Sequence, residues 1–182
     1  MHRTVMALGL AAAASGLSLI AQAPQTSAAP QTSAAPQVHA DMNQLMRGVL
    51  YPAANVVFSA QVDDPAEKTA FIPGHDPAMS TDPLTSTFGG WVAIENAALA
   101  LAESANLLLI PGRVCSTGTP APTGDASWAA FVQGMRRVSL EAYAAAQEKD
   151  MEKMIEISLP LSDSCDNCHR RWRNRRGSGR CQ

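Results

Sequence analysis

Five residues near the C-terminus constrain this chain more than any others: Cys165-Asp166-Asn167-Cys168-His169. Their spacing, C-x-x-C-H, is the attachment pattern of a c-type haem. Two thiols separated by two residues lie on one helical turn, so both can form thioether bonds to the vinyl groups of one porphyrin. The adjacent imidazole can then bind the iron as its proximal ligand. The sequence therefore predicts one covalent haem c, held by Cys165 and Cys168, with His169 on the iron.

Other interpretations of this C-x-x-C pair are weaker. The pair could be a surface disulfide or half of a zinc site. A zinc site needs about four ligands, and only Cys115 and Cys181 could add thiolates, at no recognisable spacing. A dithiol of the thioredoxin type lies in a βαβ pattern, and the sequence shows none.

The first 23 residues have the features of a secretory signal peptide. Met1-His2-Arg3 is a short basic region, residues 5–21 are apolar, and Ala21-Gln22-Ala23 is an A-x-A cleavage site. A membrane anchor is the alternative, but the run is short for a span of about 20 residues, and no stop-transfer charges follow it. We therefore expect export to the periplasm without stable membrane insertion, which agrees with the haem motif because c-type haem is attached after translocation.

Residues 24–40 form a low-complexity spacer of Pro, Ala, Ser, Thr and Gln. Its repeat, PQTSAA, has no charge and no large apolar side chain, so it cannot bury enough surface to offset the entropy of ordering. A second small-residue cleavage site, Val38-His39-Ala40, would remove the spacer. The sequence leaves the choice between the two cleavage sites open.

Residues 41–176 are expected to form one all-α domain, followed by a tail at 177–182. Four segments carry apolar residues at helical spacing, over about 41–61, 88–109, 125–149 and 150–173. Asp41 is the expected N-cap of the first segment, in which Pro52 should cause a kink, and Pro160 should bend the fourth. Four helices of this length predict a four-helix bundle, whose core can hold a cofactor. The apolar positions of the fourth segment include Met151, Met154, Ile155 and Leu159.

With its haem motif on the last helix of such a bundle, the chain resembles the class II cytochromes c. Trp172 and Arg173 follow the motif, where that family usually has Tyr or Phe before Arg or Lys. Class I cytochromes c place the motif near the N-terminus and fit poorly. Residues 45–54, 95–108 and 110–113 also resemble a less studied group of exported proteins of this type. The resemblance covers about residues 41–173, and the Arg-rich tail and the extra cysteines depart from it.

The resemblance implies two alternatives for the sixth iron position. In cytochrome c-prime the position is open and small gases can bind, whereas in low-spin relatives a Met from the first helix binds the iron. Met46 is the favoured ligand because it lies deeper in the apolar stripe, and Met42 is the second candidate. Both could instead be core residues. His39 and His75 are expected to be exposed to solvent, and Arg173 is a candidate contact of a haem propionate.

Charge is unevenly distributed along the chain. Removal of the predicted signal peptide takes away Arg3 and leaves 13 basic and 16 acidic residues. Six of the basic residues are arginines that follow the haem motif, so 7 basic and 16 acidic residues precede them. Such a basic patch beside a haem could steer a redox partner with an acidic face, or it could be a solvated tail. An exported protein is not expected to bind nucleic acid, and a homodimer is a candidate assembly.

The sequence therefore favours an exported monohaem cytochrome that carries single electrons between periplasmic partners. It is not expected to be an enzyme, because no catalytic base, nucleophile or substrate pocket can be named. A gas-binding or sensing haem protein with an open sixth position is the alternative.

In an oxidising compartment Cys115 and Cys181 could form a disulfide that ties down the tail. This arrangement is slightly favoured over intermolecular pairing or free thiols.

Overall fold

The computed structural model describes residues 35–68, 82–174 and 180–181. These residues are mostly helical and contain no β-strand, only one isolated bridge between Val114 and Pro120. The all-α class expected from the sequence is confirmed. The described residues from Pro36 onward belong to one compact unit. Among them, no helix combines the length and the apolar character that a membrane span requires.

The first helix is continuous but has three parts: α1 (Met42–Leu45), the π-helical turn η1 (Met46–Leu50) and α2 (Tyr51–Ser59). The expected N-cap is confirmed, because Asp41 and Gln44 form a reciprocal capping box. We expected a kink at Pro52, which lacks an N–H for the carbonyl of Gly48. The structure has a π turn at Met46–Leu50, shortly before the proline, where the Tyr51 N–H bonds to the Met46 carbonyl five residues back.

The second long helix, α3, runs over Trp91–Leu108, so it starts three residues later than the sequence predicted. Gly90 precedes it with φ 61° and ψ −139°, a conformation that side chains avoid. The Gly90 N–H bonds to the carbonyl of Leu84, in the short 3₁₀ helix η3 (Pro83–Thr85), at 2.7 Å. This turn keeps Phe88 outside the helix, where its side chain is exposed.

The third and fourth helices begin close to where the sequence predicted. α4 covers Ala126–Glu148, with Asp125 as its N-cap, and α5 covers Met151–Cys168, with Asp150 as its N-cap. A second π-helical turn, η4 (His169–Arg173), extends α5. α5 continues through Pro160, where we expected a bend, and Pro160 lies on its exposed side.

The apolar positions of α5 that were named from the sequence are only partly in the core. Ile155 and Leu159 are 52% and 69% exposed, whereas Ile157 and Leu161 are buried. Apolar residues alternate along this stretch, so the spacing alone supports either face of the helix. The buried set is Met154, Ile157, Ser158 and Leu161, with the three- and four-residue spacing of one helical face.

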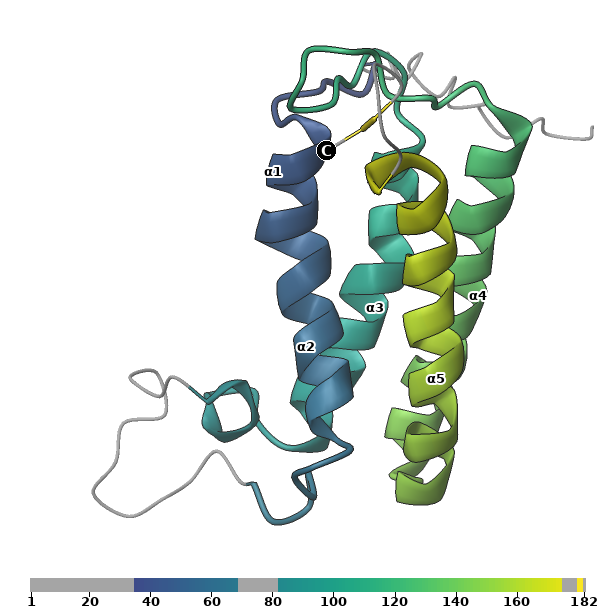
Figure 1. Cartoon of the computed structure of the whole chain (residues 1–182). Helices are drawn as coiled ribbons and strands as arrows, with labels where there is room; N and C mark the ends of the chain where they lie inside the picture. The colour runs from purple at the N-terminus through teal and green to yellow at the C-terminus, as the bar shows by residue number, and fades with distance from the viewer. Residues whose placement is uncertain (1–34, 69–81, 175–179, 182) are drawn as a thin grey trace, which may run out of the picture. The chain divides into compact units, whose positions relative to one another are not determined.

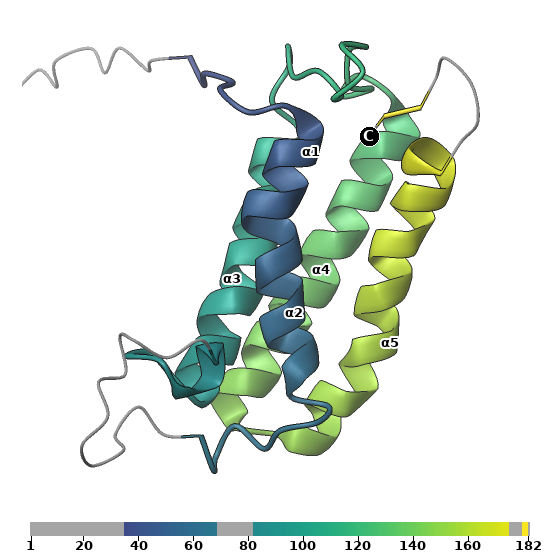
Figure 2. The ribbon, with the colours of Figure 1, turned by 60° about the vertical axis from the view of Figure 1, so that its left-hand side comes forward.

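Successive long helices run in opposite directions and lie side by side (Figure 1). α3 packs against α4, α4 against α5, and the first helix against α3. Alanines on α3, among them Ala98 and Ala105, are completely buried in these contacts. Residues 42–50 and 165–173 therefore lie at the same end of the protein, although they are far apart in sequence (Figures 1 and 2).

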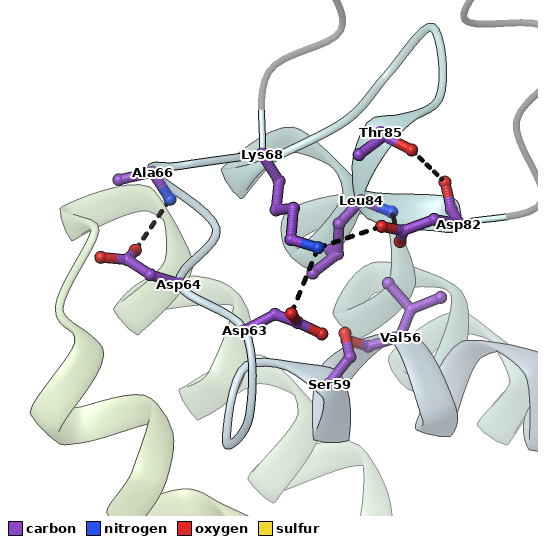
Figure 3. A network of polar contacts seen from close by, with 9 residues as sticks. All are labelled: Val56, Ser59, Asp63, Asp64, Ala66, Lys68, Asp82, Leu84 and Thr85. Carbon is purple, nitrogen blue, oxygen red and sulfur yellow. Dashed lines mark hydrogen bonds and ion pairs between the residues drawn. The ribbon is translucent and has the colours of Figure 1, made fainter.

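At the opposite end, one lysine joins the two sides of the long connection between α2 and α3. Lys68 Nζ lies 3.2 Å from a carboxylate oxygen of Asp63 and 3.3 Å from one of Asp82 (Figure 3). These hydrogen bonds raise the pKa of Lys68. Asp82 also accepts a hydrogen bond from the Leu84 N–H and thereby caps η3. The network therefore links the segment that follows α2 to the short helix η3 that precedes α3.

A disulfide closes the end that holds residues 42–50 and 165–173. Cys115, in the loop between α3 and α4, is bonded to Cys181, and both are buried. The Cys181 N–H also donates to the Trp172 carbonyl at 3.1 Å. The intramolecular pairing that the sequence slightly favoured is thus present. Cys181, which the sequence assigned to a tail, packs in the core.

We predict that replacing Cys115 and Cys181 together by Ser lowers the free energy of unfolding by about 4 kcal/mol, because a crosslink across this long a loop restricts the unfolded chain. The two cysteines are 66 positions apart. Urea unfolding followed by circular dichroism would measure the change. Wild type in the presence of a thiol reductant should unfold at the midpoint of the double variant. Equal midpoints for oxidised wild type and variant would contradict the prediction.

Candidate haem-binding site

A cavity of about 410 Å³ lies between the first helix and the last. Its walls come from residues 42–58 on one side and residues 162–173 on the other, and its back is formed by α3 and α4. Figure 2 shows the first helix and α5 on two sides of this region, with α4 behind them. The volume lies in the range of about 300–1,000 Å³ that is typical of sites for small molecules and cofactors.

The haem motif lies on one wall of this cavity. Cys165, Cys168 and His169 all line it, and each is partly buried. The two thiols are free, so they do not form the disulfide that the alternative interpretation required. The position of the motif at the end of α5 brings all three side chains to one cavity from a single helical stretch.

Burial keeps these three groups in their uncharged forms at neutral pH. Burial, and to a lesser degree the neighbouring Cys165, raises the pKa of the Cys168 thiol to about 12. Burial also raises the pKa of Cys165. It lowers the pKa of His169, in the same direction as the nearby Arg173 charge and against Asp166. The imidazole is therefore neutral at pH 7, the form that binds metal ions.

The two methionines singled out in the sequence lie on the opposite wall. Both Met42 and Met46 line the cavity. Met42 is 4% exposed and belongs to the buried core, whereas Met46 packs against that core with part of its side chain still accessible. A side chain that reaches into a cavity retains such accessibility, so the difference in burial favours Met46 over Met42 as a ligand.

The two candidate iron ligands each begin a π-helical turn. The Met46 carbonyl accepts from the Tyr51 N–H, and the His169 carbonyl accepts from the Asn174 N–H at 2.8 Å. π turns are rare in proteins and are found frequently at functional sites. Pro52 offers a sequence signal for the first turn; the second has no such signal in the sequence.

Three aromatic residues form part of the cavity wall beside the haem motif. Trp172 packs edge-to-face against Trp128 and Phe131, with ring centroids 5.0 Å and 5.6 Å apart. The Trp128 indole N–H donates to the Leu108 carbonyl at 3.0 Å, which fixes this ring. Trp128 and Phe131 lie in the segment 125–149 that the sequence predicted to be helical, and only the packing shows that they line the cavity.

Charged side chains gather at the rim of the cavity. Arg173 lines it and is largely exposed, and its Nε donates to Asn174 Oδ1 at 3.1 Å. Arg47 lines it from the first helix, a contribution that the sequence did not single out. The sequence did contain one indication of this role, because Arg47 directly follows Met46. His39 is exposed, as expected, and His75 lies outside the described residues.

The residues of this cavity fit a covalently bound haem. One wall provides two free thiols and a neutral imidazole, the other provides a thioether, and the remaining lining is mainly aliphatic and aromatic. The additional thiolates of a zinc site are not offered, because Cys115 and Cys181 are bonded to each other. Within the described ranges no three His, Cys, Asp or Glu side chains are arranged to hold a metal ion by themselves.

Comparison with protein-family models, curated proteins and solved structures finds no significant match to this chain.

Filling the cavity with a large side chain tests whether it is the haem site. Ala54 lines it from α2, and Trp at this position should fill part of it and obstruct a flat prosthetic group. We expect the Ala54→Trp variant to remain helical but to carry much less covalent haem, measured as the ratio of Soret absorbance to protein. Ala100→Trp, at a partly buried alanine of α3 outside the cavity lining, is the matched control. Equal haem content in both variants would contradict the assignment of the cavity.

Proposed function

We propose that this chain is an exported monohaem c-type cytochrome that carries single electrons between redox partners in the periplasm. The observation that carries the proposal is the shared cavity, with Cys165, Cys168 and His169 on one wall and Met46 on the other. These are the residues that the haem motif and the resemblance to class II cytochromes c select independently of any structure.

The helix arrangement supports the class II interpretation. Four long helical segments, neighbours running in opposite directions and a haem motif at the end of the last one are the features expected of that four-helix bundle. In this proposal the haem supplies a one-electron couple between Fe(III) and Fe(II). Cys165 and Cys168 would hold the group covalently, His169 and the thioether of Met46 would bind its iron, and the aromatic side chains would shield it from water.

Charge around the rim supports a protein partner with an acidic face. Arg47 and Arg173 line the cavity on opposite walls, and Arg170 and Arg171 are exposed beside them. Positive charge close to a redox centre increases the rate of encounter with a negatively charged partner. The proposed electron exchange therefore takes place at this rim.

The geometry around Ala40 favours signal cleavage after Ala23 over cleavage after Ala40. The Ala40 carbonyl accepts a hydrogen bond from Arg113 Nη1 at 2.5 Å. Cleavage after Ala40 would remove that acceptor and leave the charged amine of Asp41 close to a buried guanidinium. The exported protein of this proposal therefore begins at Pro24 and retains the spacer.

Covalent attachment is the first test of the proposed function. We predict that the protein from a host with haem-maturation machinery has an intact mass larger than its polypeptide by one haem, and that acid–acetone does not extract the colour. Changing Cys165 or Cys168 to Ala should weaken or abolish this attachment, since each thiol forms one thioether. A Ser104→Ala variant, outside the cavity, is the control. A colourless wild-type protein would overturn the proposal.

The sixth iron ligand is the second test. We predict a low-spin ferric spectrum with the weak near-infrared band of His/Met ligation, and loss of this band in Met46→Ala. That variant should be high-spin, bind CO readily and have a lower reduction potential, because thioether ligation favours Fe(II). Met42→Ala is the matched control and should keep the band. If Met46→Ala keeps it and Met42→Ala loses it, Met42 is the ligand; a high-spin wild type would favour the gas-binding alternative.

A further inference from the structure

Arg113 is a buried cation without a carboxylate partner among the described residues. Arg113 is only 4% exposed to solvent. Its Nη1 donates to the Ala40 carbonyl and its Nη2 to the Leu107 carbonyl, at 2.5 Å and 3.1 Å, while Nε has no hydrogen-bond partner. Removing a charge from water costs free energy, and burial accordingly lowers the pKa of this group. Leu107 is near the C-terminus of α3, where the helix dipole offsets part of that cost.

The two carbonyls that accept hydrogen bonds from Arg113 lie next to different parts of the cavity lining. Ala40 directly precedes the capping box that starts the first helix, and Leu107 precedes Leu108, which lines the cavity from α3. The fork of the guanidinium thus joins the start of the first helix to the end of α3. One of its two bonds spans 73 positions in sequence.

The residues after Arg113 extend this joint to the last helix. The Val114 carbonyl accepts from the Met42 N–H at 2.8 Å, and Cys115 is bonded to Cys181, whose N–H donates to the Trp172 carbonyl. Residues 113–115 are therefore bonded directly to the start of the first helix and are connected to the last helix through Cys181. The first helix and α5 otherwise pack mainly against α3 and α4, respectively, with the cavity between them.

We propose that Arg113 is a positioning residue of the haem site. It fixes the start of the first helix against α3 and the Cys115 loop, and so holds Met46 at a constant position opposite His169. This inference rests on the proposed function. Arg113 does not line the cavity, so it acts through the first helix and not by contact with the cofactor.

The test compares Arg113→Met with Arg136→Met in the haem-containing protein. Arg136 makes three hydrogen bonds, to Gln133 on its own helix and to Ala102 and Asn106 on α3, and its side chain is not part of the cavity lining. Both variants lose an arginine that joins helices. Hydrogen exchange measured by mass spectrometry reports the local opening of each helix, and the ferric near-infrared band reports Met ligation.

For Arg113→Met we expect exchange in residues 42–50 to accelerate about tenfold relative to α4, which corresponds to about 1.4 kcal/mol. The His/Met band should weaken, and CO should bind faster. Arg113→Lys retains a charge and one hydrogen bond, so it should be intermediate. Arg136→Met should leave both readouts for the first helix unchanged. Equal acceleration in α4 and residues 42–50, or an unchanged band in a folded Arg113→Met, would overturn the inference.

If neither Arg113 variant folds, the Asp41→Ala variant tests whether the joint at the start of the first helix positions Met46. This change removes the capping box at the same joint, at a partly exposed position. It should accelerate exchange in residues 42–50 and weaken the band in the same direction, and an unchanged band would overturn the inference. The exchange readout does not require haem. A wild type without covalent haem would therefore refute the proposed function while the exchange data still test the joint itself.

Discussion

The structure depends on keeping its first and last helices apart while holding both firmly. Each packs against a neighbour, the first helix on α3 and α5 on α4, and the contact between α3 and α4 joins the two pairs. The cavity occupies the space between the outer helices. If the first helix and α5 packed directly against each other, they would bury more apolar surface but would leave no room for a cofactor. Stability is therefore supplied by the back of the cavity and by the loop at its end.

The sequence predicted the helices well where local chemistry defines their ends. Asp41, Asp125 and Asp150 each accept hydrogen bonds from the first turn of a helix, so these three starts lie close to the predicted ones; for the third helix the sequence had offered Asp125 or Ser127, and the structure has Asp125. The start of α3 was missed because Gly90 takes a positive φ to meet the Leu84 carbonyl, a contact made through tertiary structure. The face of α5 was missed because apolar residues occur on both of its sides, and packing against α4 selects Ile157 and Leu161.

The candidate site was predictable to the extent that its chemistry is local in sequence. The C-x-x-C-H spacing places Cys165, Cys168 and His169 together. The resemblance to class II cytochromes c pointed to a Met of the first helix, which gave Met42 and Met46, and both line the cavity opposite the motif. Arg113 could not be found in this way. Its two acceptors are backbone carbonyls, which carry no residue-specific signal, and the carbonyl of Ala40 is 73 positions away.

Under the proposed function, three features of the cavity act on the reduction potential in the same direction. The lining is mainly apolar, and a medium of low dielectric constant disfavours the additional positive charge of Fe(III). Arg47 and Arg173 at the rim add like charge, although their exposure to solvent weakens the effect. The thioether of Met46 also favours Fe(II). Because the first two act whether or not Met46 binds the iron, the change in potential on losing that thioether would measure the ligand's contribution separately from that of the cavity.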